Sequence, residues 1–382
     1  MTTFLVHGLI FATWLSRVAS VKSLLRLSDG VLGLTLLGGA IGSVLAIPAS
    51  GWLVARRGSR TMAQWTSLGF CATLALPGLA VNAGTLFAAL LVFGAMAGAN
   101  DVSMNAEAVA IEKMLGLRAI SRFHGMFSVG GIAGSAVGAL VASRHISPRV
   151  HLDAATIVLI VISATGRALM PHVPAADSAA IAGPVFRRVP RALIALSAIG
   201  FCVLLSEGAI GDWSGVYLKQ VIHTTDGFAP LGYAVFSASM AVFRMTGDAI
   251  THRLGGALTV RLGACIACFG VTAMTVASSP WLVLAGLAAV GAGFSSIVPL
   301  VFAAGGRDKS LAEGIGVATV SGIGYLGFLV GPPAIGFISQ VSSLRWGLFL
   351  LAVLSGTAAW LVSGVSRGNA DLWRARSAPG ES

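Results

Sequence analysis

The stretch TLFAALLVFGAMAGANDVSMNAEAVA, residues 85–110, decides the fold class. An apolar run leads without a turn signal into a polar half that carries Asn100, Asp101, Asn105 and Glu107. A segment of this length can cross a bilayer as one helix, on which Asp101 and Asn105 share one face. Asn100 and Glu107 fall on a second stripe. Polar groups at this depth are costly unless they face water or a partner, so the segment predicts a functional membrane helix.

The composition extends this prediction to the whole chain. Its 382 residues are 56% hydrophobic and 10% charged, and the mean hydropathy is +0.87, whereas soluble domains contain about 25% charged residues. Long apolar runs recur throughout, so we expect an all-α polytopic membrane protein rather than a β-barrel of short alternating strands. The first apolar run begins next to Met1 without a basic leader, which indicates a retained span and no cleaved signal peptide.

The apolar runs predict twelve transmembrane helices. The expected spans are 3–21, 31–52, 62–81, 85–110, 121–143, 154–171, 190–218, 229–251, 259–278, 281–304, 312–340 and 345–366. The net charge of +11 is concentrated in alternate loops, among them those around Arg56, Lys113 and Arg187. The positive-inside rule therefore predicts that these loops and both termini are cytoplasmic, which explains the charge better than nucleic-acid binding does.

One long polar interruption divides the chain into halves that match. The predicted domains are an N-terminal six-helix bundle (1–171), a cytoplasmic linker (172–189), a C-terminal six-helix bundle (190–366) and a cytoplasmic tail (367–382). Three features recur at an offset of 197 residues: SDG at 28–30 as TDG at 225–227, Arg56-x-Gly58 as Arg253-x-Gly255, and Gly130 and Gly134 as Gly327 and Gly331. Such a repeat is typical of secondary transporters, whose substrate site lies between the repeats near the bilayer midplane.

The loop GWLVARRGSR, residues 51–60, resembles the loop signature of the major facilitator superfamily. The matching positions are Gly51, Arg56, Gly58 and Arg60. Ala55 stands where the family has an aspartate, which removes one partner of the usual inter-helix charge contact. The resemblance covers essentially the whole chain. It implies twelve helices in two six-helix bundles, related by a pseudo-two-fold axis, that give alternating access to a central cavity.

Within the superfamily the chain resembles the fucose-permease-like branch, which includes membrane proteins associated with rhizopine, an inositol derivative. Fucose-type proton symporters carry an acidic residue in span four and an asparagine four residues later, a spacing that Asp101 and Asn105 fit. Their fifth span has a glutamine shortly before Ser-x-Gly, and here His124 precedes the sequence at 128–130. The resemblance implies proton-coupled transport of a sugar, polyol or amino-polyol.

The candidate site residues are polar groups within the expected spans. Asp101 is the first choice for the proton-coupling carboxylate, followed by Glu207 and then Glu107; the alternative for Asp101 and Glu107 is a helix–helix hydrogen-bond clamp. The candidate substrate-binding residues are Asn100, Asn105, His124, Trp213 and Trp14. Trp213 suits an interfacial aromatic belt equally well, and His124 suits a packing role equally well.

Two further pairs of charges attract attention. Arg17 lies late in span one and, at the repeat offset, falls within one turn of Asp212 in span seven. We expect these two residues to form a periplasmic gate; the alternative is that Arg17 extends to lipid headgroups while Asp212 serves the cavity. Arg244 and Asp248 are four residues apart near the cytoplasmic end of span eight, a spacing that predicts a structural ion pair; the alternative is a contact with the substrate.

The sequence therefore predicts a secondary active transporter of the bacterial inner membrane. Its expected partners are a small polar solute, protons and the lipid bilayer, and it is expected to act as a monomer. No Walker loop, metal motif or enzyme signature occurs in the sequence, so we expect no cofactor, no metal, no nucleic acid and no catalytic residue. The alternatives are a proton-driven exporter of drugs or metabolites, and a membrane sensor that binds a solute without moving it.

Overall fold

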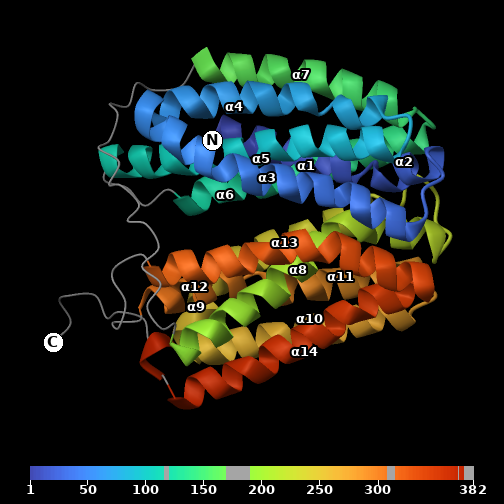
Figure 1. The fold of residues 1–382 in the computed structure, drawn as a ribbon. Coiled ribbons are helices and arrows are strands. Elements are labelled where there is room, and N and C mark those ends of the chain that lie inside the picture. Colours follow the sequence, from blue (N-terminus) through green and yellow to red (C-terminus); the bar gives the residue numbers. More distant parts are fainter. Residues whose placement is uncertain (116–119, 169–189, 308–314, 369, 374–382) are drawn as a thin grey trace. The chain divides into compact units, whose positions relative to one another are not determined.

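Helices make up the fold of the residues that the computed structural model describes, which are 1–115, 120–168, 190–307, 315–368 and 370–373 (Figure 1). The first half contains α1 (Thr2–Leu15), α2 (Val18–Leu24), α3 (Asp29–Arg57), α4 (Ser59–Thr73), the 3-10 turn η1 (Leu76–Leu79), α5 (Ala83–Leu115), α6 (Ile120–Ser143) and α7 (Pro148–Ala168). The second half contains α8 (Arg191–Gln220), α9 (Leu231–Leu254), α10 (Gly256–Val276), α11 (Pro280–Phe294), α12 (Ile297–Gly306), α13 (Ile315–Val341), α14 (Leu344–Gly368) and the 3-10 turn η2 (Ala370–Trp373). The predicted all-α class is confirmed.

Ten segments within the described ranges are long and apolar enough to cross a membrane. Two of them are broken helices, α1 with α2 and α11 with α12, so the expected first and tenth spans each contain a kink. The expected third and eighth spans are not among these ten segments. α4 ends after 15 residues, and α9 carries several charged side chains. The chain is a multi-pass membrane protein.

The chain forms two compact units that do not simply follow its two halves. The first unit contains Met1–Ile181, Gly211–Ser237 and Pro332–Leu344; the second contains Ala182–Ile210, Ala238–Gly331 and Arg345–Ser382. The first unit thus includes the second part of α8 and the end of α13 as well as the first seven helices. The predicted linker, 172–189, lies outside the described residues, as does most of the predicted tail, 367–382. The predicted domain boundaries stay a prediction.

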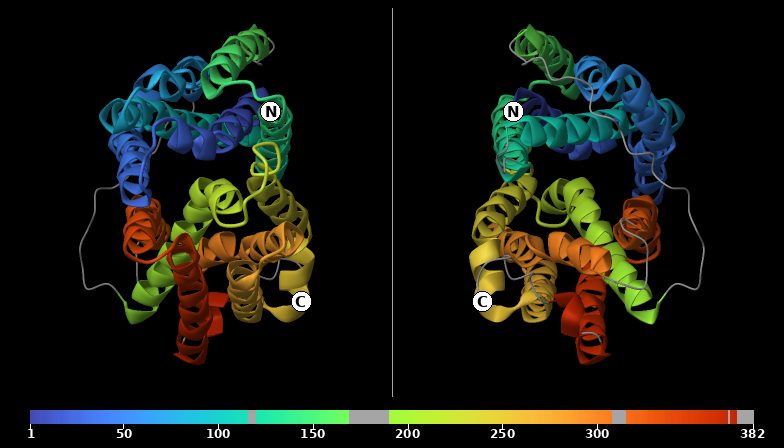
Figure 2. Two further views of the ribbon diagram at one scale, coloured as in Figure 1. Left: turned by 90° about the vertical axis from the view of Figure 1, so that its right-hand side faces the viewer. Right: turned by 90° about the vertical axis from the view of Figure 1, so that its left-hand side faces the viewer.

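Close helix pairs build the first unit, whose members are seen along their length in Figure 1 and close to end-on in Figure 2. α3 packs along α5, α1 along α6, and α4 against both α5 and α7. The approach of α3 to α5 requires glycine: a Cβ atom built on Gly94 would lie 1.9 Å from the carbonyl oxygen of Gly39. Small residues at such interfaces let the backbones approach closely. The resulting van der Waals packing holds the helices together, because lipid supplies no hydrophobic driving force between them. In the second unit α10 and α11 pack in the same way.

The repeat predicted from the sequence extends to backbone conformation. Gly58, between α3 and α4, has φ of 83°, and Gly255, between α9 and α10, has φ of 78°. Arg26 and His223, which also differ by 197 residues, adopt the left-handed conformation with φ of 52° and 59°. This conformation is uncommon for non-glycine residues, so its recurrence at one offset supports the internal repeat.

The repeat also extends to helix packing. A Cβ atom built on Gly130 of α6 would lie 2.2 Å from the carbonyl oxygen of Leu5 in α1. One built on Gly327 of α13 would lie 2.6 Å from the carbonyl oxygen of Phe201 in α8. Each glycine therefore brings the fifth helix of its repeat against the first. The two contacts are related by nearly the same offset, as the prediction for these glycines requires.

Candidate functional site

Asp101 and Asn105 form the exposed polar face of α5. The side-chain amide nitrogen of Asn105 donates to Asp101 Oδ1 at 3.1 Å and to the Asp101 carbonyl oxygen at 2.9 Å. Asp101 is exposed and Asn105 half-buried, in the middle of an apolar helix of 33 residues. A carboxylate at this depth is tolerated where water reaches it. Asp101 and Asn105 therefore form a polar face on an otherwise apolar helix.

The opposite stripe of α5 is buried, as the predicted second stripe implies. Asn100 is completely buried. Its amide nitrogen bonds His7 Nδ1 at 2.8 Å, and its Oδ1 accepts from Thr66 Oγ1 at 3.1 Å. Asn100 therefore joins α1, α4 and α5 inside the first unit instead of lining an open cavity, which does not fit the predicted contact with substrate.

The histidine of this network is a residue that sequence reasoning missed. His7 is buried among the rings of Phe11, Phe70 and Phe127, whose centroids lie 5.1, 5.0 and 5.7 Å from its own. A lone imidazole inside the first apolar run was the available signal. Because its neighbours are aromatic and its polar contact is an amide, the ring serves packing and hydrogen bonding in this structure.

Glu107 links the C-terminal part of α5 to the start of α4. Ser59 Oγ donates to Glu107 Oε2 at 2.6 Å, and the carboxylate is buried. Its second oxygen, Oε1, has no hydrogen-bond partner among the described residues. Ser59 is the first residue of α4, where unpaired amides favour an anion. This geometry fits the clamp that the sequence left open for Glu107.

Glu207 occupies the middle of α8 in the second unit. Its residue as a whole is half-buried, but Oε1 is enclosed and finds no hydrogen-bond donor within the described part of the chain. Arg244 of α9 interacts with it electrostatically. The expected ion pair between Arg244 and Asp248 is not formed: neither residue belongs to an ion pair of the described residues.

The predicted aromatic contacts lie in packed surroundings. Trp213 is completely buried, and its indole nitrogen has no hydrogen-bond partner among the described residues. Trp14 is buried with its ring centroid 6.5 Å from that of Phe93. Neither ring is open to a solute in this structure. His124 is half-buried and meets Phe4 edge-on at 5.2 Å, in a contact between α6 and α1.

Arg17 is satisfied by other partners than the one predicted. It stands at the break between α1 and α2, where it is buried. Its Nε donates to His151 Nδ1 at 2.9 Å, and its Nη2 donates to the carbonyl oxygen of Ile146 at 2.9 Å. The expected ion pair with Asp212 is absent from the ion pairs of the described residues, because Arg17 points toward the start of α7. Asp212 is half-buried on α8.

A buried lysine near Arg17 was also missed. Lys22 Nζ contacts Asp29 Oδ1 and lies 2.5 Å from Gln220 Oε1, so it connects α2, the start of α3 and the end of α8 within the first unit. Gln340 of α13 joins the same place, where its Oε1 accepts from the amide of Gly30 at 3.2 Å. The SDG and TDG repeat marked Asp29, but nothing in the sequence marked the glutamines that bond Lys22 and Gly30.

The signature loop between α3 and α4 is built around Gly58 and exposed basic residues. The guanidinium of Arg56 stacks over Trp52 at 4.1 Å from the ring centroid. Gly51 has open space around it, with nothing within 4 Å of a built Cβ atom. The Nε of Arg60 is buried. Ala55 occupies the position of the family aspartate, and the carboxylate of Glu107 accepts a hydrogen bond from Ser59 of this region.

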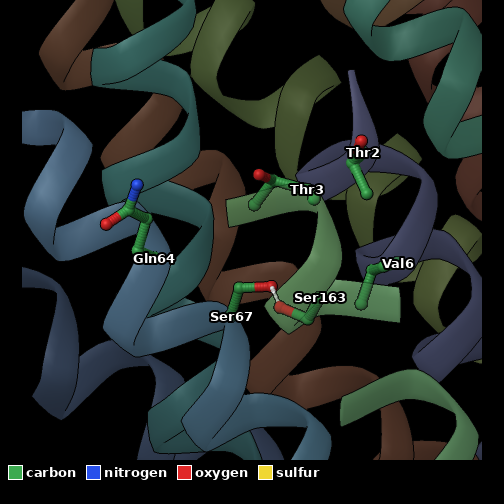
Figure 3. A pocket seen from close by; sticks show the side chains of 7 residues that line it. Thr2, Thr3, Val6, Gln64, Ser67 and Ser163 are labelled. Carbon is green, nitrogen blue, oxygen red and sulfur yellow. Dashed lines mark hydrogen bonds between the residues drawn. The ribbon is translucent and has the colours of Figure 1, made fainter. Parts of the chain in front are cut away.

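A small recess lies between α1, α4 and α7 of the first unit. Its walls are Thr2, Thr3, Val6, Gln64, Ser67, Ser163 and Gly166 (Figure 3). The hydroxyls of Ser67 and Ser163 are 2.9 Å apart and bond each other across α4 and α7. Since these two groups satisfy one another, the recess serves helix packing.

Comparisons with known proteins agree with a helical membrane protein. The sequence model of the Major Facilitator Superfamily matches residues 1–309. An uncharacterized MFS-type transporter of Yersinia pestis is 34% identical over 370 residues, which cover 95% of this chain and 94% of that protein. Membrane protein MosC of Rhizobium meliloti is 32% identical over 355 residues, 92% of this chain and 85% of that protein.

Solved structures show the same fold. A mutant of the nucleoside transporter NupG superposes with a TM-score of 0.75 at 13% identity, over 95% of this chain and 98% of that one. A bacterial homologue of the human lysosomal transporter Spinster, in an inward-facing and unoccupied conformation, gives 0.74 at 14% identity over 98% of both chains. At these identities the likeness concerns the fold alone. Together with the family match and the repeat of six helices, it establishes that this chain belongs to the Major Facilitator Superfamily of membrane transporters.

Proposed function

We propose that this chain is a proton-coupled secondary transporter that moves a small polar solute across the bacterial inner membrane by alternating access. The solute class is a sugar, polyol or amino-polyol. The observation that carries the proposal is the exposed face of Asp101 and Asn105 in the middle of α5. Proton binding in a membrane requires a carboxylate that water can reach, and Glu107, the next acidic residue along this helix, is buried.

The two stripes of α5 would then have separate tasks. Asp101 binds and releases the proton, and Asn105 fixes the carboxylate while offering its remaining polar groups to a solute. Asn100 and Glu107 hold α5 against α1 and α4. This division supports coupling, because the proton site is attached to a helix that is firmly positioned on its other side.

Orientation belongs to the same proposal. Basic residues such as Arg56, Arg57 and Arg253 lie in the last turns of α3 and α9, and these helix ends would face the cytoplasm together with both termini. Lys22 and Gln340 would then lie on the periplasmic side. Membrane-impermeant thiol labelling of single cysteines placed beside Arg57 and Lys22 tests this orientation in intact cells.

The decisive experiment is a proton-flux measurement in proteoliposomes against a library of sugars, inositols and amino-polyols. We expect Asp101→Asn to abolish proton-driven accumulation and to retain solute exchange without a gradient, because asparagine keeps the shape of the site but cannot titrate. Glu107→Gln is the matched control on the same helix; it retains an acceptor for Ser59 and should leave coupling intact. Unchanged accumulation in Asp101→Asn would remove Asp101 from the proton pathway. Lack of flux with every solute would overturn the proposed substrate class.

A further inference from the structure

Helix α9 presents two different exposed stripes. Val242, Met245 and Ala249 follow a spacing of three and four residues and are exposed, with 85% of the Met245 side chain accessible. Such an apolar stripe suits lipid. Arg244 and Asp248, four residues apart, form a separate exposed polar stripe on the same helix. A helix that carries both stripes borders lipid on one side and water on the other.

Arg244 lies deep within α9. Its Cα is about 15 Å along the axis from the nearer end of the helix, at about 1.5 Å per residue. The expected eighth span, 229–251, includes Arg244 in its second half. An arginine at such a depth is costly and marks a functional site unless a structural partner neutralises it.

The side chain is anchored in place but not neutralised. Its Nε donates to the carbonyl oxygen of Ser295 at 3.1 Å, at the break between α11 and α12. Gly247 lets α9 approach this break, because a Cβ atom there would lie 2.5 Å from Ser296 Oγ. Nη2 meets only the thioether of Met240, at 3.2 Å, which is a weak acceptor.

Acidic neighbours do not take up the remaining donors. Asp248, one turn further along, forms no ion pair with Arg244, and Glu207 of α8 interacts with it only across a longer distance. A guanidinium has five donors in a planar fork that matches a carboxylate or a phosphate. Here one donor is used to fix the direction of the fork, and the outer edge is left exposed.

We infer that Arg244 binds an anionic group of the transported solute, so that the substrate is an acidic sugar or polyol derivative rather than a neutral one. The inference rests on the proposed function and narrows its substrate class. Asp248, exposed one turn away, limits how much negative charge the site accepts. A phospholipid headgroup carries the same anionic chemistry, and the experiment must distinguish a lipid from a free solute.

The test compares matched acidic and neutral sugars: galacturonate with galactose, and gluconate with glucose, at equal ionic strength. Binding is measured on the whole purified protein in nanodiscs of phosphatidylcholine. We expect the acidic member to bind at least tenfold more tightly. Arg244→Gln should remove this preference without weakening binding of the neutral member, and Arg244→Lys should restore part of it. Asp248→Asn removes the neighbouring negative charge and should tighten binding of the acidic member.

Each result decides the matter. Equal affinity for acidic and neutral members, or an acid preference that survives in Arg244→Gln, overturns the inference and leaves the proposed transport of polar solutes standing. If no member binds or moves, the proposed substrate class falls, and the inference falls with it. Nanodiscs that contain phosphatidylglycerol separate the two anion sources. If phosphatidylglycerol abolishes the acid preference of the unmodified protein, while Arg244→Gln in phosphatidylcholine retains that preference, Arg244 binds lipid and the inference is overturned.

Discussion

Replacement of Lys22 by methionine tests the buried junction between α2, α3 and α8. The Lys22 side chain is 5% exposed and that of Asp29 is 19% exposed. Lys22 Nζ also donates to Gln220 Oε1 at 2.5 Å. Methionine keeps the length of the aliphatic chain but removes the charge and all donors. The variant therefore leaves Asp29 in place with no cation beside it.

The expected cost follows from burial. Removing one partner of a fully buried ion pair costs about 3–5 kcal/mol. Asp29 keeps some access to water, which lowers this figure, while loss of the charged hydrogen bond to Gln220 raises it by about 1–2 kcal/mol. We expect Lys22→Met to lower the free energy of unfolding by about 2–4 kcal/mol once both effects are counted.

The repeat supplies a matched control in the same molecule. Lys219 and Asp226 form the equivalent ion pair at the offset of 197 residues, but their side chains are 24% and 37% exposed. Surface pairs contribute about 0–1 kcal/mol, and this pair is more exposed than Lys22–Asp29, so Lys219→Met should cost less than Lys22→Met. Each variant changes the same chemical group at the same position of its repeat, so the two differ in burial and in the hydrogen bond to Gln220, which belongs to Lys22.

Denaturant titration of the purified protein in one detergent, followed by tryptophan fluorescence, measures the difference. The double variant Lys22→Met with Asp29→Asn should be more stable than Lys22→Met alone, because it also removes the uncompensated carboxylate. Equal effects of Lys22→Met and Lys219→Met would refute the argument from burial. A double variant less stable than Lys22→Met would refute the argument from the unpaired charge.

Three further substitutions probe packing in the first unit, all by thermal unfolding in detergent. Asn100→Ala should cost about 2–4 kcal/mol because it removes two buried hydrogen bonds, whereas Asn105→Ala on the exposed face should cost under about 1 kcal/mol; similar losses would contradict the two-stripe assignment. Gly33→Val should destabilise by about 1–3 kcal/mol or more, since its Cβ would meet a backbone oxygen of α13 at 2.5 Å; Gly51→Val, with open space around it, is the control. Arg17→Ala should cost about 2–4 kcal/mol because the side chain is buried with two acceptors, and an unchanged unfolding temperature would return Arg17 to the gate role predicted from the sequence.

Much of the fold could be predicted from the sequence, because lipid imposes simple rules on a backbone. Long apolar runs must become helices, and α5 appears where residues 85–110 placed it. The separation of Asp101 from its neighbour Asn100 was also predictable, since adjacent residues on a helix point in different directions. Which stripe would be buried was not, because that depends on His7 and Thr66, which are distant in sequence.

The candidate site was less predictable for the same reason. Arg17 was expected to meet an acid on an equivalent helix, but a neutral histidine and a carbonyl group at the start of α7 satisfy its donors. Periodicity gives the depth and face of a residue, while the choice between possible partners depends on how far each neighbouring helix is shifted along its axis. No spacing in the chain encodes that shift.

The repeat shows where one sequence pattern has two structural outcomes. Gly30 at the start of α3 packs on Gln340 of α13, and at the same offset Gly227 packs on Ser143 of α6. The contact of Gly30 therefore uses a long amide side chain, whereas the contact of Gly227 uses a short hydroxyl side chain. Gln340 accepts from the Gly30 amide, whereas Ser143 Oγ donates to the carbonyl of Leu140 within its own helix.

The position equivalent to Gln220 differs in the same way. It is occupied by Ser23, whose hydroxyl donates to the carbonyl oxygen of Ala19 one turn earlier. A serine that bonds its own helix offers nothing to the opposite lysine. Within the described part of the chain Lys219 therefore pairs only with Asp226, while Lys22 has both Asp29 and Gln220. The common ancestry of the repeats thus sets the backbone and the Lys–Asp pair, and two glutamines in the second repeat decide which copy of that pair becomes a buried connection between segments.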